Sequence, residues 1–195
     1  MGKGRLEAFS DGVLAIIITI MVLELRVPHG STIADLRPLL PVGLGYVLSF
    51  IYIGIYWNNH HHLLQAAHHI RGGVLWANMH LLFWLSLVPF VTGWMGAHPG
   101  ARGPVVCYGI VLLCAGIAYY ILAHALVAIH EKGSAIALAI GRDRKGMLSV
   151  ALYASAIGLA FVNTWISIGI YTAVALIWVV PETRIERRLD EEHPL

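Results

Sequence analysis

Long apolar runs alternate with short polar connections along the chain. An α-helix rises about 1.5 Å per residue, so about 20 apolar residues cross the hydrocarbon core of a bilayer, which is about 30 Å thick. Six runs approach this length, at about residues 8–27, 42–64, 74–95, 105–129, 147–161 and 165–180. The pattern therefore predicts an all-α integral membrane protein in which residues 1–195 form a single unit of six transmembrane helices.

Prolines and the lengths of the runs add detail to this layout. Pro89 lies inside the third run and predicts a kink, which a helix bundle tolerates because neighbouring groups satisfy the freed carbonyl. The fifth and sixth runs are only about 16 residues long, which is marginal for a full crossing. We interpret them either as a hairpin around a turn near Asn163 or as one bent element. Pro181 ends the series.

The composition supports a membrane protein. Hydrophobic residues make up 58% of the chain and charged residues only 12%, about half the charged fraction of a soluble domain. The connections are too short to hold a soluble domain, so the function must reside among the helices, and we expect neither an enzyme nor a cofactor. The net charge is only +2, and the basic residues lie near helix ends without interleaved aromatic residues, which argues against nucleic acid as a partner.

The basic residues favour one orientation in the membrane. With six crossings both termini lie on the same side, and the loops of that side hold ten lysines and arginines against three in the others. Because positively charged loops stay in the cytoplasm, we predict cytoplasmic termini in a multi-pass protein of the cell membrane. This orientation places the start of the first helix at the same level as residues 57–62 and residues 76–80 of the second and third helices.

The first helix carries polar residues near its start. Arg5 and Asp11 are six residues apart, about 240° around a helix, so they do not face each other as an i, i+4 pair would. An ionisable group inside a bundle is costly without a partner. The shared level offers four candidate partners from other helices: Asn58, His60, His61 and His80. An equally good interpretation is that Ser10 and Asp11 cap a helix that begins at Gly12, with Arg5 in solvent.

These polar residues form a pattern. Arg5, Phe9, Ser10 and Asp11 give the motif R-x-x-x-F-S-D at the opening of the first apolar helix, and a cluster of asparagine and histidine follows Trp57 at the end of the second. In both features the chain resembles the transmembrane protein 175 family, which comprises endosomal and lysosomal potassium channels and their bacterial relatives. The resemblance extends to the layout, since bacterial members carry one six-helix unit and animal members carry two.

The resemblance implies a potassium-permeable channel in which four identical chains surround a central pore lined by the first helix. The bulky aliphatic constriction of the family would correspond here to Ile16, Ile20 and Leu23. Their spacing puts them on one face of a helix, although a buried packing stripe would have the same spacing and the run is apolar all round. The chain has no T-V-G-Y-G sequence, which excludes that carbonyl filter and predicts modest selectivity among monovalent cations.

Two further residues of the first helix are candidate ion contacts. The hydroxyl of Thr19 either binds a cation weakly or bonds to Ala15 within the helix. Glu24 would raise the local cation concentration if it faces the pore, and would otherwise pair with Arg26 or face solvent. We hypothesise that the motif and the facing cluster pack the pore helix against the second and third helices. This set comprises Arg5, Phe9, Ser10, Asp11, Trp57, Asn58, His60, His61 and His80.

Eleven histidines leave other functions open. One is a histidine-rich metal transporter, and another is a haem-binding redox protein with His80 and His124 as axial ligands. The consecutive histidines at 60–62 point about 100° apart on a helix and so cannot all bind one ion, and we expect no resident metal. A membrane protein without a transport role is a third alternative. We favour the channel, with potassium ions, membrane lipids and further copies of the chain as partners.

Overall fold

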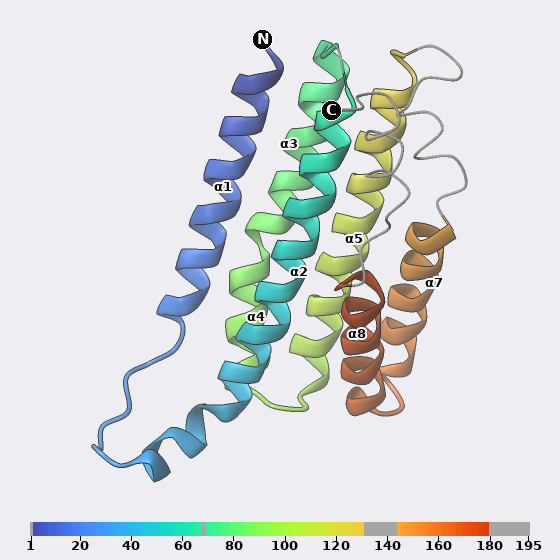
Figure 1. Ribbon diagram of the computed structural model, residues 1–195. Coiled ribbons are helices and arrows are strands. Elements are labelled where there is room, and N and C mark those ends of the chain that lie inside the picture. The colour runs from blue at the N-terminus through green and yellow to red at the C-terminus, as the bar shows by residue number, and fades with distance from the viewer. Residues whose placement is uncertain (1, 68, 131–143, 180–195) are drawn as a thin grey trace.

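The computed structural model describes residues 2–67, 69–130 and 144–179, and these form helices joined by short connections (Figure 1). The helices are α1 (Lys3–Leu23), the 3-10 helix η1 (Ile33–Leu39), α2 (Leu40–Gln65), α3 (Gly72–Ser86), α4 (Val88–Ala97), α5 (Arg102–Val127), α7 (Arg144–Leu159) and α8 (Thr164–Val179). The prediction of an all-α fold is confirmed for the described part of the chain. Pro181 and the C-terminal tail lie outside these ranges.

Four of the helical stretches are long and apolar enough to cross a membrane: α1, η1 with α2, α3 with α4, and α5. The other two, α7 and α8, are apolar but have only 16 residues each. They pack against each other as a hairpin, and Asn163 in the turn accepts a hydrogen bond from the backbone N–H of Trp165 at 2.9 Å. The described residues thus form four long spans and a short hairpin rather than six full-length spans.

The third run is broken at the position where Pro89 predicts a kink. Helix α3 ends at Ser86, and α4 begins at Val88 with the proline in its first turn. Proline has no N–H for the helical ladder, and its ring crowds the carbonyl four residues earlier. Leu87 joins the two halves, and its N–H bonds to the carbonyl of Trp84 at 3.2 Å, a tighter turn than in an α-helix. The predicted kink is confirmed.

Helix α1 begins and ends earlier than its apolar run. The run covers about residues 8–27, whereas the helix covers Lys3–Leu23. The additional first turn is hydrophilic, and a lysine and a glutamate one turn apart approach each other to 4.0 Å in it. Ser10 and Asp11 consequently lie about two turns inside the helix, and the interpretation in which they cap its N-terminus is wrong.

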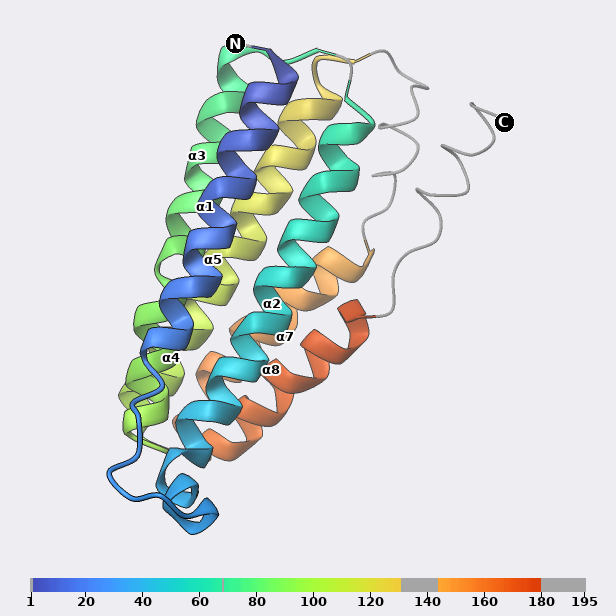
Figure 2. The same cartoon turned by 60° about the vertical axis from the view of Figure 1, so that its left-hand side comes forward.

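Helix α5 runs through the middle of the bundle and packs against α3, α4, α7 and α8, while α1 lies at one edge against α2, α3 and α4 (Figures 1 and 2). Tyr108 of α5 and Tyr171 of α8 are fully buried with their ring centroids 5.6 Å apart. The hydroxyl of Tyr171 donates to the carbonyl of Val105 at 3.2 Å and occupies the space that a side chain on Gly109 would need. Gly109 therefore permits the close approach of the hairpin to α5.

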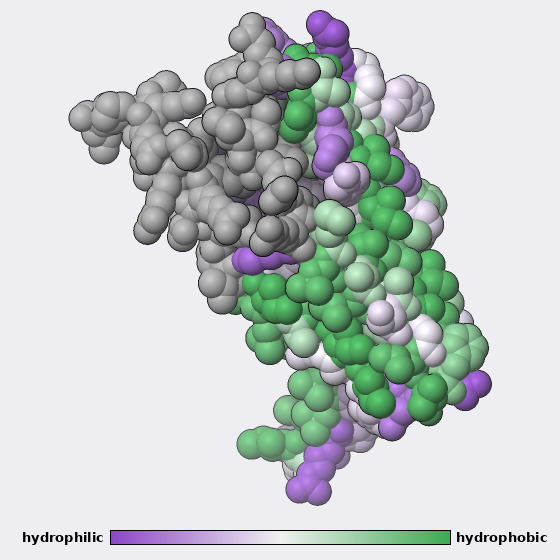
Figure 3. Space-filling view, turned by 90° about the vertical axis from the view of Figure 1, so that its right-hand side faces the viewer, coloured by the Kyte–Doolittle hydropathy of each residue, from purple (hydrophilic) through white to green (hydrophobic). Residues whose placement is uncertain are grey.

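Apolar side chains cover the outside of the bundle on the side of α7 and α8 (Figure 3). Leu148, Ile166 and Leu176 are among the exposed residues of these helices. A continuous exposed apolar surface of this kind is typical of a surface that contacts another apolar phase. Together with the four long spans, it identifies a multi-pass membrane protein.

Candidate functional site

A buried chain of hydrogen bonds joins α1, α2 and α3. Asn78 of α3 donates from Nδ2 to Ser10 Oγ of α1 at 2.9 Å, and its Oδ1 lies 2.7 Å from Nε2 of His60 on α2. Ser10 in turn donates to the carbonyl of Leu6 at 2.9 Å. Because the amide oxygen of Asn78 can only accept, Nε2 of His60 carries the proton in this arrangement. All three polar side chains are buried, with exposed fractions of 2% or less.

This network fixes the rotation of α1 about its own axis. An unpaired buried polar group costs about 1–3 kcal/mol, so turning Ser10 away from Asn78 is unfavourable. The same face of α1 buries four apolar side chains against the bundle: Leu6, Leu14, Ile17 and Met21. One face of the helix is therefore anchored by both packing and hydrogen bonds.

A second face of α1, about 120° around the helix from the buried one, is left uncovered by the single chain. Ile16, Ile20 and Leu23 lie on this face with exposed fractions of 57%, 44% and 77%, and Phe9 of the motif is also exposed. The hydrophobic pattern did not predict this orientation, because the run is apolar on all sides. Burial of the three residues as a packing stripe within one chain is excluded by these exposed fractions.

Asp11 lies beside the buried network but is itself exposed. Trp57 of α2 donates from Nε1 to Asp11 Oδ1 at 3.0 Å, and its ring stacks on that of His61 with centroids 6.0 Å apart. This contact is a second link between α1 and α2. Arg5 is exposed, and among the described residues no ion pair joins Arg5 or Asp11 to another side chain.

Not every residue that was predicted to lie at the membrane level of Ser10 and Asp11 joins the buried network. His80 is exposed and accepts a hydrogen bond from Trp84 on its own helix at 2.9 Å, and Asn58 is partly buried on α2. The residue that bridges Ser10 and His60 is Asn78, which the sequence analysis did not select. Its signal was an amide side chain within an apolar run, two residues from His80, on the face that also holds Ala77 and Leu81 in the core.

Two candidate ion contacts lie at the C-terminal half of α1. Thr19 is exposed, and its hydroxyl donates to the carbonyl of Ile16 at 2.9 Å rather than to that of Ala15. Glu24 is the C-cap residue of α1, and its carboxylate lies against α4, where a Cβ on Gly93 would come within 2.9 Å of Oε2. The absence of a side chain at Gly93 thus leaves room for the carboxylate.

The two candidate haem ligands bond to residues of their own helices. His124 is exposed, with Nδ1 2.9 Å from the carbonyl of Tyr120 and its ring centroid 3.8 Å from that of the tyrosine. His80, the other candidate haem ligand, is bonded to Trp84. Within the described residues, no three His, Cys, Asp or Glu side chains are grouped to hold a metal ion.

Comparison with known proteins places this arrangement in a family. A family model described as the endosomal/lysosomal potassium channel TMEM175 matches residues 5–89, which hold the motif, the network and most of α1. A potassium channel of Chryseobacterium sp. (strain P1-3) is 53% identical over 191 residues, covering 98% of this chain and 100% of the relative. The chain belongs to the TMEM175 family. The resemblance seen in the motif is thereby confirmed, and so is the expectation that the chain is not an enzyme, because TMEM175 is a family of ion channels.

Other TMEM175 relatives extend the comparison to structure. The crystal structure of a lysosomal potassium-selective channel TMEM175 homolog from Chamaesiphon minutus matches with a TM-score of 0.78 and 30% identity, covering 91% of this chain and 96% of that one. The human endosomal/lysosomal proton channel TMEM175 is 38% identical over 105 residues, which cover 48% of this chain and 20% of the relative. The fold described above is therefore the TMEM175 fold.

Proposed function

We propose that four copies of the chain form a potassium-permeable channel of the cell membrane, with cytoplasmic termini and with α1 of every copy around a central pore. Ile16, Ile20 and Leu23 form the constriction. The names of the bacterial relatives support potassium as the permeant ion. The observation that carries the arrangement is the uncovered apolar face of α1, held in a fixed rotation by the buried network on its buried face.

A row of small residues supports packing of α1 against its own copies rather than only against lipid. Ala8, Gly12, Ala15 and Thr19 are exposed and follow one another at intervals of three or four residues, so they share a flank of the helix beside Ile16. Small residues allow helices to approach closely in a membrane, where packing drives association. The small flank packs on a neighbouring α1, and this contact turns the isoleucines toward the axis.

The chemistry of the constriction determines how it conducts. A ring of isoleucine and leucine side chains repels water, so a narrow pore of this kind gates by dewetting and makes an ion shed part of its hydration. Aliphatic groups offer an ion no ligand, which predicts modest selectivity. The hydroxyl of Thr19 donates a hydrogen bond to the Ile16 carbonyl, which leaves its oxygen lone pairs available to contact a passing cation.

Potassium flux tests this proposal. We expect vesicles containing the full-length chain to pass potassium, and Ile16→Ala to increase the flux and move the reversal potential in mixed potassium and sodium toward equal permeability, because a smaller side chain widens the constriction. Ile166→Ala is the matched control, since Ile166 is similarly exposed but lies on α8. Vesicles without flux, or unchanged reversal potentials in Ile16→Ala, would contradict the proposal.

The same vesicles distinguish potassium flux from proton flux. The animal relatives are named proton channels, so a pH-sensitive dye enclosed with the potassium indicator measures both ions in one preparation. We expect the potassium flux to persist at equal pH on the two sides. Proton flux without potassium flux would contradict potassium as the permeant ion of this chain.

A further inference from the structure

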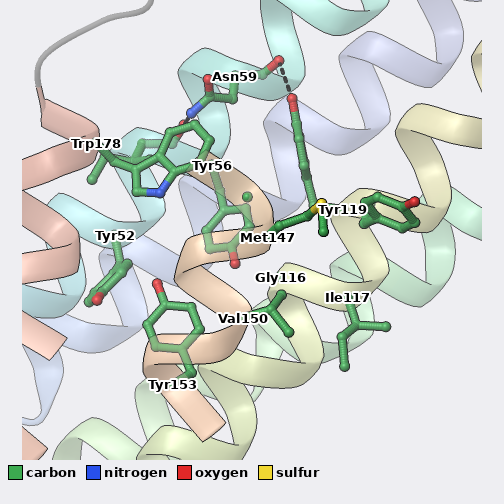
Figure 4. A pocket seen from close by; sticks show the side chains of 13 residues that line it. Tyr52, Tyr56, Asn59, Gly116, Ile117, Tyr119, Met147, Val150, Tyr153 and Trp178 are labelled. Carbon is green, nitrogen blue, oxygen red and sulfur yellow. Dashed lines mark hydrogen bonds between the residues drawn. The ribbon is translucent and has the colours of Figure 1, made fainter. Parts of the chain in front are cut away.

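An apolar cavity of about 320 Å³ lies between α2, α5, α7 and α8 (Figure 4). It lies where the start of α7 and the last turn of α8 meet the second halves of α2 and α5. Aromatic rings and aliphatic side chains form most of its wall: Tyr52, Tyr56, Ile117, Val150, Tyr153 and Trp178. Nothing in the pore proposal uses this space.

Several polar groups around the cavity are bonded to protein. The hydroxyl of Tyr52 donates to the carbonyl of Tyr171, and the amide of Asn59 donates to the carbonyl of Ile55 at 2.8 Å. Tyr119 donates to the carbonyl of Asn59 at 3.2 Å, as Figure 4 shows. A ligand here is recognised by apolar contact. An apolar cavity of about 150 Å³ holds a benzene molecule, so this cavity accepts a longer hydrocarbon.

Some of the residues that line the cavity, on α5 and α7, are also exposed on the outside of the bundle. Met147, which lines the cavity, is 67% exposed, and Ile117 and Tyr120 on the facing side of α5 are about 40% exposed. A helix of 16 residues is about 24 Å long, whereas the hydrocarbon core is about 30 Å thick. With the turn of the hairpin at one membrane surface, its open end therefore lies close to the other surface. Trp178 and the tyrosines are the residue types that favour this interfacial level.

A positive charge stands at the same level. The ammonium group of Lys145, in the first turn of α7, lies 5.8 Å from the centroid of the Trp178 ring. Trp178 is held in this position by its indole N–H, which donates to Ser149 at 2.8 Å. An apolar cavity at the interface, beside a lysine, matches the two parts of a phospholipid that carries a net negative charge.

We propose that this cavity binds one acyl chain of an anionic phospholipid from the leaflet on the side of the N-terminus, with the phosphate near Lys145. The chain enters between Ile117 and Met147 and lies against Tyr153. Each subunit would bind one such lipid in its own cavity, away from the proposed pore.

Photochemical labelling tests the proposal in the intact protein. The full-length chain is reconstituted with phosphatidylglycerol that carries a diazirine in one acyl chain, irradiated, and digested for mass spectrometry. Tyr52 and Tyr153 have exposed fractions of 2% and 3%, so bulk lipid does not reach them, whereas Phe90 is 65% exposed. We expect adducts on the buried tyrosines as well as on Phe90. Labelling of Phe90 without labelling of either tyrosine would overturn the proposal.

Gly116 provides a variant that fills the cavity. A Cβ at this position would make ordinary contacts, with Val150 at 3.7 Å and Tyr153 at 3.9 Å, and a longer side chain would extend into the space. We expect Gly116→Leu to reduce labelling of the tyrosines about ten-fold, which corresponds to about 1.4 kcal/mol of binding. Gly158→Leu is the control, because a side chain there meets nothing within 4 Å. Equal tyrosine labelling in both variants would overturn the proposal.

Two measurements keep the test decisive. Gly116→Ala, whose methyl group fits without displacement, covers the case in which Gly116→Leu does not fold, and it should reduce labelling by a smaller factor. A phosphatidylcholine probe with the same diazirine isolates the head group. We expect it to label the tyrosines less than the phosphatidylglycerol probe, and Lys145→Gln to remove that difference. Equal labelling by the two probes in the wild type would overturn the role of Lys145.

Discussion

Asn78 connects three helices with a single side chain. Its amide group both donates and accepts, which matches the serine on α1 and the protonated nitrogen of His60 on α2. An aspartate would lack the donor for Ser10, and a leucine would leave His60 without its partner and Ser10 without a donor in a buried site. The residue thus sets the position of α1 without touching the proposed pore.

We predict that Asn78→Ala lowers the stability of the protein by about 1–3 kcal/mol, because it leaves His60 without its partner in a buried site. Asn59→Ala is the matched control, since Asn59 is only partly buried and donates to a carbonyl of its own helix. Thermal unfolding in detergent, followed by tryptophan fluorescence, measures the difference. A double-mutant cycle with Ser10→Ala isolates the bond between the two side chains. Equal unfolding temperatures for the two asparagine variants would contradict this prediction.

For individual residues, the sequence predicted which residue types take part in the network better than it predicted their hydrogen-bond partners. Ser10 and His60 were candidates because they are polar and lie at one membrane level, and both are in the network. His80 met the same criteria but points away from α1, since level alone does not give the rotation of a helix. The exposed face of α1 was unpredictable from its composition, because Ile16 and the buried Ile17 are the same residue type.

Helix α4 packs closely against α2 and the end of α1 through glycines. A Cβ on Gly96 would lie 2.7 Å from the Cα of Val42, whereas one on Gly93 would lie 2.9 Å from the end of the flexible Glu24 side chain. The Cα of Val42 belongs to the backbone and can move only with α2, whereas the carboxylate of Glu24 can rotate away. Two glycines three residues apart on one helix therefore have different tolerance for the same substitution.

We predict that Gly96→Ala destabilises the protein by about 1–3 kcal/mol, because α2 and α4 must separate to admit the methyl group. Gly93→Ala should change stability by less than about 1 kcal/mol, since Glu24 moves aside and alanine favours the helix. Chemical unfolding followed by circular dichroism compares the two variants. A larger loss in Gly93→Ala than in Gly96→Ala would contradict this account of the α2–α4 contact.

At the scale of elements, the sequence predicted what local chemistry controls. The break beside Pro89 follows from a missing N–H and appears at Leu87. The start of α1 was predicted too late because hydropathy locates the membrane and not the helix, and the first turn of α1 is hydrophilic. The choice between a hairpin and one bent element at Asn163 required tertiary packing, which no local pattern contains.

The single chain is incomplete on one side. The packed core lies around α5, while α1 stands at the edge with the side chains of the proposed constriction outward. In the proposed tetramer these faces meet at the axis. Apart from the family motif, nothing in the sequence indicated this partner, because the surface of a membrane protein is apolar whether lipid or protein covers it.

We predict that Ile20→Cys forms disulfide-linked dimers between subunits when Cys107 and Cys114 are replaced by serine. Side chains at the constriction of a four-fold pore approach one another, and Ile20 is 44% exposed in the single chain. Ile166→Cys is the control, with 46% exposure on α8. Oxidation in membranes followed by non-reducing electrophoresis measures the products. Dimers in equal yield from both variants, or from neither, would contradict the arrangement around α1.

Because of the break at Leu87, two separate helices, α3 and α4, pack against α1. Helix α3 holds the N-terminal half of α1 through Asn78, and α4 contacts its other half near Glu24. A tilt of α4 about this pivot would swing Leu23 while Ser10 stays bonded. The two ends of the proposed pore are therefore supported by separate helices, and a movement of the loop after Ala97 would displace Leu23 without breaking the hydrogen bond to Ser10.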